Sequence, residues 1–193
     1  MRYEKLAIPD VVLLAPRVFG DDRGFFMESF NQRVFEDVTG VPATFVQDNH
    51  SRSSRGVLRG LHFQLHQPQG KLVRVVAGEV LDVAVDVRPR SATLGHWVSA
   101  RLSADNHRQL WVPPGFAHGF VVFSDVAELL YKTSDYYAPE YERAIRWDDP
   151  ALSIDWCRDQ WAWSGEPTLS RKDQDALSWH AALREIRAVD GRA

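Results

Sequence analysis

Two histidines, a glutamine and a lysine stand at spacings that could build one reactive site. His62 alternates with Gln64 in a short apolar run, Lys71 opens the next run, and His118 lies further along the chain. A histidine with an unperturbed pKa of ~6.5 is suited to general-base work near neutral pH. A protonated lysine cannot ligate a divalent cation and repels one, but it can stabilise an oxyanion. These residues predict a site that stabilises negative charge without a metal.

The spacing resembles the metal motif of cupin barrels, which reads His-x-His, three or four residues, Glu, six residues, Gly, and later Pro-x-Gly-x-x-His. Gln64 stands where the second histidine would be, and Lys71, with six residues between it and Gly78, stands where the glutamate would be. The stretch Pro113-Pro114-Gly115-Phe116-Ala117-His118 retains the last part. The resemblance implies a metal pocket rebuilt around a fixed cation, which argues against a metal-dependent cupin oxygenase or sugar isomerase.

An acid and an orienting carboxylate are also available. Tyr131 lies in a strand-like run; most such tyrosines serve packing, but a phenol beside a cation can also return a proton to a carbanion. Asp173 follows Ser170 at the spacing of a helix-capping box. Asp173 could alternatively orient His62, as in other base and carboxylate pairs. Because the two are far apart in the sequence, both interpretations of Asp173 stay open.

Cationic side chains could bind phosphate oxygens, although any one of them alone is more often a solvated charge. The candidates are Arg23, Arg59 and Lys172. Arg59 precedes His62 by three residues, so strict strand alternation places the two on opposite faces. A curved strand end or a contact from a neighbouring subunit would remove that objection.

These residues need a β-rich framework, and the sequence predicts one. Short apolar runs separated by Gly, Pro, Asn and Asp predict strands near 11–15, 24–30, 44–48, 57–63, 71–77, 79–87, 96–102, 108–112, 118–123 and 127–133. In Val80–Val87, apolar residues alternate with Asp82, Ala84 and Asp86, which predicts a half-buried strand. Ala77-Gly78-Glu79 predicts a tight hairpin. We therefore expect an all-β fold, a closed or sandwiched antiparallel barrel with peripheral helices.

Two helices interrupt this pattern. One is predicted over Asn31 to Val38, with Asn31 as N-cap and Gly40 beyond its end. The other is C-terminal, at about 175–190, where apolar residues recur at helical spacing. We expect one domain over residues 1–193, since a chain of this length can bury one sizeable core.

Composition restricts the partners and the compartment. A net charge of −3 gives no general attraction for nucleic acid or for an anionic membrane. The single cysteine, Cys157, excludes an internal disulfide and is typical of a reducing compartment. The N-terminal residues lack a signal-peptide pattern, and no apolar run approaches the ~20 residues of a membrane span. The expected location is the cytoplasm.

Several motifs together carry a more specific resemblance. They are Gly20–Ser29, Phe45–Ser51, Leu58–Gln64, Gln109–Phe120, Leu130–Lys132 and Leu169–Asp173. From Ile8 to Asp173 the chain is similar to the dTDP-4-dehydrorhamnose 3,5-epimerase family, the RmlC-like branch of the cupin superfamily. The resemblance implies a cupin-like antiparallel jelly-roll barrel. It also implies cofactor-free epimerisation of dTDP-4-dehydro-6-deoxy-D-glucose at C3 and C5, giving dTDP-4-dehydro-L-rhamnose.

The resemblance also implies roles for individual residues. His62 would remove the proton with Asp173 paired to its ring, Lys71 would stabilise the C4 enolate, and Tyr131 would return a proton from the opposite face. Substrate contacts carry over to Arg23, Phe26, Glu28, Gln47, Asp48, Asn49, Arg59, His118, Glu142 and Lys172. Members of the family are homodimers whose N-terminal strands cross to the partner. Some of these groups would then serve the partner's pocket.

Rival functions remain open on the sequence alone. A sibling enzyme could epimerise only C3 or only C5, and a non-catalytic module could bind the sugar nucleotide without proton exchange. The Trp-rich stretch from Trp156 to Pro167 and the helix after Asp175 depart from the family pattern. Since both lie near Lys172 and Asp173, these two assignments depend most on the tertiary structure.

Overall fold

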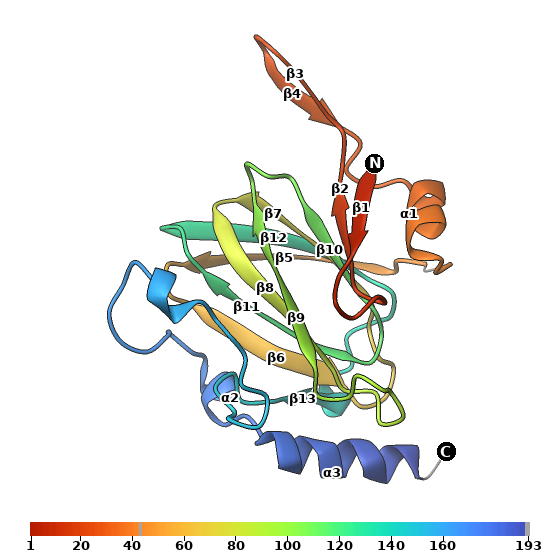
Figure 1. Cartoon of the computed structure of the whole chain (residues 1–193), viewed down its shortest axis with the longest axis vertical. Coiled ribbons are helices and arrows are strands. Elements are labelled where there is room, and N and C mark those ends of the chain that lie inside the picture. Colours follow the sequence, from red (N-terminus) through yellow and green to blue (C-terminus); the bar gives the residue numbers. More distant parts are fainter. Residues whose placement is uncertain (43, 192–193) are drawn as a thin grey trace.

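The computed structural model describes residues 1–42 and 44–191 and consists mainly of two antiparallel sheets that face each other (Figure 1). The six-stranded sheet has the order β1 (Arg2–Lys5), β2 (Val12–Ala15), β10 (Gln109–Val112), β7 (Lys71–Ala77), β12 (Val126–Thr133), β5 (Gln47–Ser54). The five-stranded sheet has the order β13 (Glu142–Ala144), β6 (Leu58–Gln64), β11 (Phe116–Val122), β8 (Glu79–Asp86), β9 (Trp97–Ser103). These sheets confirm the predicted all-β, cupin-like class.

The main core lies between the two sheets. Side chains at alternate positions of facing strands meet there, among them Val73 of β7, Leu129 of β12 and Phe120 of β11. Because a strand presents successive side chains to opposite faces, the residues between these core positions face outward. The inward direction of His62, Lys71 and Tyr131 follows from this alternation.

The outer face of the five-stranded sheet is also buried. Leu61 and Phe63 of β6 pack there with Val83 of β8, under Trp147, Trp156 and other residues of the chain that follows β13. The helix α3 (Trp179–Asp190) completes this cover, which is visible below the barrel in Figure 1. The Trp-rich stretch of unassigned role is therefore an outer layer of the core.

This cover corrects the prediction for Val80–Val87. The strand β8 is buried on both faces rather than on one, because its apolar side chains lie under the tryptophan layer. Its other face points between the sheets, and Asp82 on that face is fully buried. A polar side chain in this strand therefore marks the interior of the barrel and not the solvent.

The outer face of the six-stranded sheet is covered in part by α1 (Gln32–Thr39), where Phe35 packs edge-on against Trp111. The Asn31 side chain accepts a hydrogen bond from the Val34 amide, and Gly40 ends the helix with a φ of 72°. Both caps confirm the sequence prediction for this helix.

The predicted hairpin at Gly78 is wrong. The strands on its two sides, β7 and β8, belong to different sheets and do not pair with each other. Gly78, with a φ of 74°, is the corner at which the chain passes from one sheet to the other. A Cβ there would lie 2.0 Å from the Val126 carbonyl oxygen, so glycine is required at this position.

Several boundaries also differ from the prediction. The strands β1, β3 (Val18–Asp21) and β13 have no counterpart among the predicted runs, and β5 begins only at Gln47. The short helix α2 (Arg171–Gln174) precedes α3, which starts at Trp179 rather than near 175. The short 3₁₀ turns η1 (Pro139–Tyr141) and η2 (Arg158–Gln160) complete the list of elements.

The strands β3 and β4 (Gly24–Met27) form a separate hairpin that projects from the body of the protein (Figure 1). Its phenylalanines are exposed although they are large and apolar: Phe19 is 51% exposed, Phe25 61% and Phe26 72%. Such a concentration of exposed aromatic rings is typical of a surface that contacts another molecule. In the part of the chain that the structure describes, no helix combines the length and apolarity that crossing a membrane requires.

Candidate active site

His62 and Asp173 meet although 111 residues separate them in the sequence. Leu61 and Phe63 face the tryptophan layer, so His62 points into the barrel, as alternation predicts. Its Nε2 donates to Asp173 Oδ1 at 2.6 Å. Since an ionised carboxylate only accepts, this bond places the proton on Nε2 and leaves Nδ1 as the basic nitrogen.

Asp173 is held in place by the start of a helix. Ser170 is the N-cap of α2: its Oγ accepts from the Asp173 amide and donates to Asp173 Oδ2 at 2.6 Å. Burial raises the pKa of Asp173, but hydrogen bonds from His62, Ser170 and the Gly60 amide outweigh it and lower the pKa. The capping interpretation and the orienting interpretation therefore both describe this residue, because the cap aims the carboxylate at His62.

A second histidine and carboxylate pair lies beside the first. His118 on β11 is directly opposite His62 on β6 in the strand register, so both rings share the inner face. His118 is buried, and its Nε2 contacts the two oxygens of Asp82 at 2.8 and 3.0 Å. Sequence reasoning did not single out Asp82 as a site residue; the signal was an aspartate inside a valine-rich strand.

The six-stranded sheet supplies the opposite wall. Lys71 and Tyr131 lie on the adjacent strands β7 and β12, and Tyr131 packs against the core between the sheets. Loss of solvation lowers the pKa of Lys71 to about 8, while the nearby charges of Glu142 and Asp82 raise it and that of Lys172 lowers it further. Lys71 lines one small pocket together with His62, Tyr137 and Glu142, where a negative charge could be stabilised.

Glu142 contacts two further polar side chains of the site. Its carboxylate pairs with Lys172 and accepts a hydrogen bond from the Tyr137 hydroxyl at 2.6 Å. These two contacts outweigh the effect of burial and lower the pKa of Glu142, while the same carboxylate raises the pKa of Tyr137 to about 12. Tyr137 was missed by sequence reasoning, since a tyrosine in the loop after β12 carries no distinguishing pattern.

Arg59 shares the inner face with His62, contrary to the simple alternation argument. On β11 the partners of His62 and Arg59 are His118 and Phe120, two residues apart, whereas Arg59 and His62 are three apart. This shift is a β-bulge, which adds one residue to β6 and returns Arg59 to the face of His62. Burial raises the pKa of Tyr131, and the charge of Arg59 opposes that rise.

The predicted substrate-binding residues of the edge strand β5 lie on two different faces of the sheet. Gln47 and Asn49 alternate with Asp48, and the Gln47 side chain accepts a hydrogen bond from the Tyr137 amide at 3.1 Å. Asp48 lies on the other face, where it pairs with Lys132 at 2.9 Å. Within one chain, therefore, Gln47 and Asn49 belong to the same face as Tyr131, and Asp48 does not.

Three further predicted contacts, besides Asp48, are not brought to His62 within the chain. Arg23 and Phe26 lie on the projecting hairpin, where Arg23 pairs with Asp21. Glu28 follows the hairpin and accepts a hydrogen bond from Asn31. Figure 1 shows the hairpin extending away from β6 and β11, the strands that carry the two histidines.

Gln64 has a structural use at the position of the missing metal ligand. Its amide nitrogen donates to the carbonyls of Gln67 and Tyr136, and its oxygen accepts from the Ala138 amide. The side chain thereby holds the loop that carries Tyr137. Across residues 1–42 and 44–191 there is no group of three or more His, Cys, Asp or Glu side chains arranged to hold a metal ion.

The comparisons with known proteins agree with this geometry. The sequence model of dTDP-4-dehydrorhamnose 3,5-epimerase matches residues 5–181. The chain belongs to this epimerase family. The dTDP-4-dehydrorhamnose 3,5-epimerase of Pseudomonas aeruginosa is 63% identical over 179 residues, which cover 93% of this chain and 96% of that protein.

Solved structures of epimerases in this family have a fold similar to that of this chain. The crystal structure of the dTDP-6-deoxy-D-glucose-3,5-epimerase RmlC from Legionella pneumophila, in complex with dTDP-4-keto-L-rhamnose, is 48% identical with a TM-score of 0.88, covering 94% of this chain and 96% of that chain. A dTDP-4-dehydrorhamnose 3-epimerase of Streptomyces niveus is more distant, at 40% identity over 92% of this chain and 83% of that protein. The epimerase family match includes the Trp-rich stretch and ends within α3.

Proposed function

We propose that this chain catalyses the epimerisation of dTDP-4-dehydro-6-deoxy-D-glucose at C3 and C5, giving dTDP-4-dehydro-L-rhamnose. The observation that carries the proposal is the division of the site between two walls: His62 comes from the five-stranded sheet and Tyr131 from the facing six-stranded sheet. Inversion of a carbon centre requires a base and an acid on opposite sides of the sugar ring. The 3,5-epimerase of Pseudomonas aeruginosa, at 63% identity, is a nearer relative than the 3-epimerase of Streptomyces niveus, at 40%, which supports the double reaction.

The proposed mechanism is proton transfer through an enolate. The C4 ketone acidifies the hydrogens at C3 and C5, and His62 Nδ1 removes one of them while Asp173 stabilises the imidazolium that forms. The electron pair moves onto the C4 oxygen, where the Lys71 ammonium stabilises the enolate. Tyr131 then gives its phenolic proton to the carbon from the opposite face. Once His62 has released its proton to solvent and the Tyr131 phenolate has taken one up, the same steps at the second carbon complete the product.

The reaction is tested by following the product in deuterated water by proton NMR. Two inversions at the proposed site predict deuterium at both C3 and C5 of the product. Deuterium at one carbon alone would identify a single-site epimerase instead. Tight binding of the sugar nucleotide without any exchange would identify a non-catalytic binding module.

Removal of the proposed acid should separate exchange from inversion. In Tyr131→Phe, His62 and Lys71 are intact, so we expect solvent deuterium to enter the substrate while formation of the inverted product falls by about 10²-fold. NMR of recovered substrate and product measures both rates in one reaction. Equal loss of exchange and inversion would contradict the role of Tyr131 as the acid.

The protonation of Lys71 should set the upper pH limit of kcat/KM. Because its pKa is lowered to about 8, the group is charged below that pH and neutral above it. Stabilisation of the enolate requires the charged form, so kcat/KM should fall as the pH rises through about 8. A pH profile of kcat/KM measures this fall, which is the alkaline limb of the profile.

Substitution of Glu142 should shift the alkaline limb of the kcat/KM profile. Glu142→Gln removes a charge that raises the pKa of Lys71 and releases Lys172, whose charge lowers it. The alkaline limb of kcat/KM should therefore move to lower pH. Glu140→Gln, an exposed glutamate beside the same strand, is the matched control and should leave the limb in place. An unchanged limb in Glu142→Gln would show that Glu142 does not act on Lys71.

We also infer that the protein works as a homodimer in which the β3–β4 hairpin reaches the partner's site. Arg23 and Phe26 lie on this exposed, aromatic hairpin and not beside His62 of the same chain. A symmetric dimer would let each hairpin bring its arginine and phenylalanine to the other subunit.

The free thiol of Cys157 and the nucleotide-sugar substrate support a cytoplasmic location.

Mixed dimers test the hairpin. Arg23→Ala and His62→Asn chains carrying different tags are coexpressed, and the doubly tagged species is isolated. If Arg23 serves the partner, one of the two sites in that dimer is complete, so about half of the wild-type activity should return although each variant alone is impaired. Absence of recovery in the isolated mixed dimer would place Arg23 in its own chain's site.

A further inference from the structure

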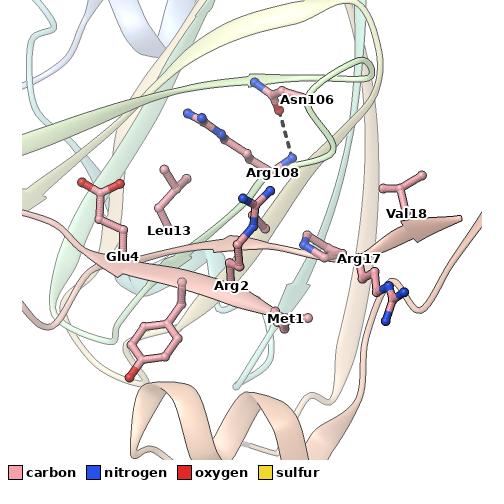
Figure 2. Close-up of a pocket in the computed structure, with 11 residues that line it drawn as sticks. Met1, Arg2, Glu4, Leu13, Arg17, Val18, Asn106 and Arg108 are labelled. Carbon is pink, nitrogen blue, oxygen red and sulfur yellow. Dashed lines mark hydrogen bonds between the residues drawn. The ribbon is translucent and has the colours of Figure 1, made fainter.

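A large hollow of about 810 Å³ lies beside β1, β2 and the first residue of β3 (Figure 2). Members of the family are expected to meet their partner through these N-terminal elements, so the hollow belongs to the contact surface of the proposed homodimer. A different feature, at the end of β8, concerns the reaction itself.

The strand β8 ends in a buried carboxylate that several donors hold. Asp86 has no exposed surface, and it accepts hydrogen bonds from the Arg88 guanidinium at 2.9 and 2.6 Å. The hydroxyls of Ser91 and Thr93 each donate to it at 2.6 Å. Burial raises the pKa of Asp86, but these hydrogen bonds outweigh it and lower the pKa to about 2. The charged carboxylate therefore holds the Arg88 side chain in one place.

Arg88 packs against the loop that begins β11. Its guanidinium lies over the Phe116 ring, 4.7 Å from the centroid. Its aliphatic part covers Gly115, where an added Cβ would lie 2.6 Å from Arg88 Cγ. The Gly115 carbonyl also accepts a hydrogen bond from the Val87 amide at 3.1 Å, and Asp86 is opposite Phe116 in the strand register. The arginine thus fixes both the backbone and the ring at the start of β11.

This loop is a wall of the active site. Gly115 and Phe116 line the same small pocket as His62 and Lys71. Phe116 belongs to the core between the sheets, and His118, two residues later, lies on the same face of the strand. A shift of the loop would therefore move a wall of the pocket together with the ring of His118.

We infer, on the basis of the proposed function, that Arg88 is a positioning residue, which acts through Gly115 and Phe116 to place the pocket wall beside Lys71. Lysine at this position keeps the charge but loses the paired hydrogen bonds and the stacking of a planar guanidinium. Because a displacement of about 1 Å can cost roughly 10²-fold in rate, Arg88→Lys should lower kcat by about tenfold or more. KM should change little, since the predicted nucleotide contacts on β5 belong to the other sheet.

Arg101→Lys is the matched control. Arg101 on β9 also pairs with a carboxylate, that of Glu79, and its guanidinium lies over the Phe123 ring at 3.6 Å. Glu79 is at the opposite end of β8 from Asp86. The control should lower the thermal midpoint and keep the kcat of the wild type. A purely structural role would make Arg88→Lys behave in the same way when both variants are assayed below their midpoints.

Histidine NMR of the unliganded protein gives a readout that does not need turnover. A displaced Phe116 ring changes the ring current at the neighbouring imidazole. Arg88→Lys should therefore shift the His118 ring signals, which are assigned by their loss in His118→Asn, and Arg101→Lys should leave them in place. Thr93→Val loses one hydrogen bond to Asp86 with less change to the fold, and it should shift these signals in the same direction.

Either a wild-type kcat or unshifted His118 signals in Arg88→Lys would overturn the inference. An inactive wild type would contradict the proposed epimerisation instead, and the His118 signals alone would then decide whether Arg88 positions this wall.

Discussion

His62→Asn is expected to abolish proton exchange at both C3 and C5 and to lower kcat by about 10²–10⁴-fold, the usual contribution of a positioned general base. Asparagine keeps a polar side chain on the inner face, although its amide is too short to replace the Nε2 bond to Asp173, and it cannot accept a proton near neutral pH. One base serving both carbons predicts that exchange at the two positions disappears together. Deuterium incorporation measured by NMR, together with a coupled assay of product, gives the result.

The matched control for this substitution is His50→Asn. His50 lies on the outer face of β5, where its ring contacts Glu128 and not the interior of the barrel. The control should retain wild-type exchange. If His62→Asn kept exchange at either carbon, another group would have to be the base there, and His118 beside it would be the first candidate.

Lys71→Met is expected to lower kcat by about 10²–10³-fold, the range measured for loss of one oxyanion donor. Methionine fills a similar volume without the charge, so the enolate loses its electrostatic partner while the shape of the site is kept. Since the lowered pKa shows that burial disfavours this ammonium, the substitution should leave the thermal midpoint unchanged or raise it. Steady-state kinetics and thermal unfolding measured on the same preparation separate the two effects.

Lys71→Arg provides the complementary result. A guanidinium stays charged throughout the accessible pH range, so the residual activity of this variant should lose the alkaline limb near about 8. Its planar head places the charge differently, which should still reduce the rate. Near-normal activity in Lys71→Met would show that the enolate is stabilised by other groups, and the proposed mechanism would then be wrong.

The sequence by itself determined the local features of this protein. Alternation of His62 with Leu61 and Phe63 predicted that the histidine points into the barrel, and the caps at Asn31 and Gly40 predicted the limits of α1. The spacing of Lys71 from Gly78, through its resemblance to the cupin motif, predicted a cation in the barrel beside His62. Such features depend on the direction of side chains along one strand or one helical turn, which nearby residues control.

Only the tertiary structure decided how distant elements meet. The bulge that returns Arg59 to the face of His62 exists in the pairing of β6 with β11; Gly60, with a φ of 114°, lies at that place, but a glycine alone does not fix the pairing. The passage at Gly78 is a corner rather than a hairpin because β7 and β8 find other partners. The bond from His62 to Asp173 and the place of Tyr137 beside Glu142 likewise join separate segments. Register between strands and the path of the chain between sheets depend on the packing of the whole core, which a local pattern does not contain.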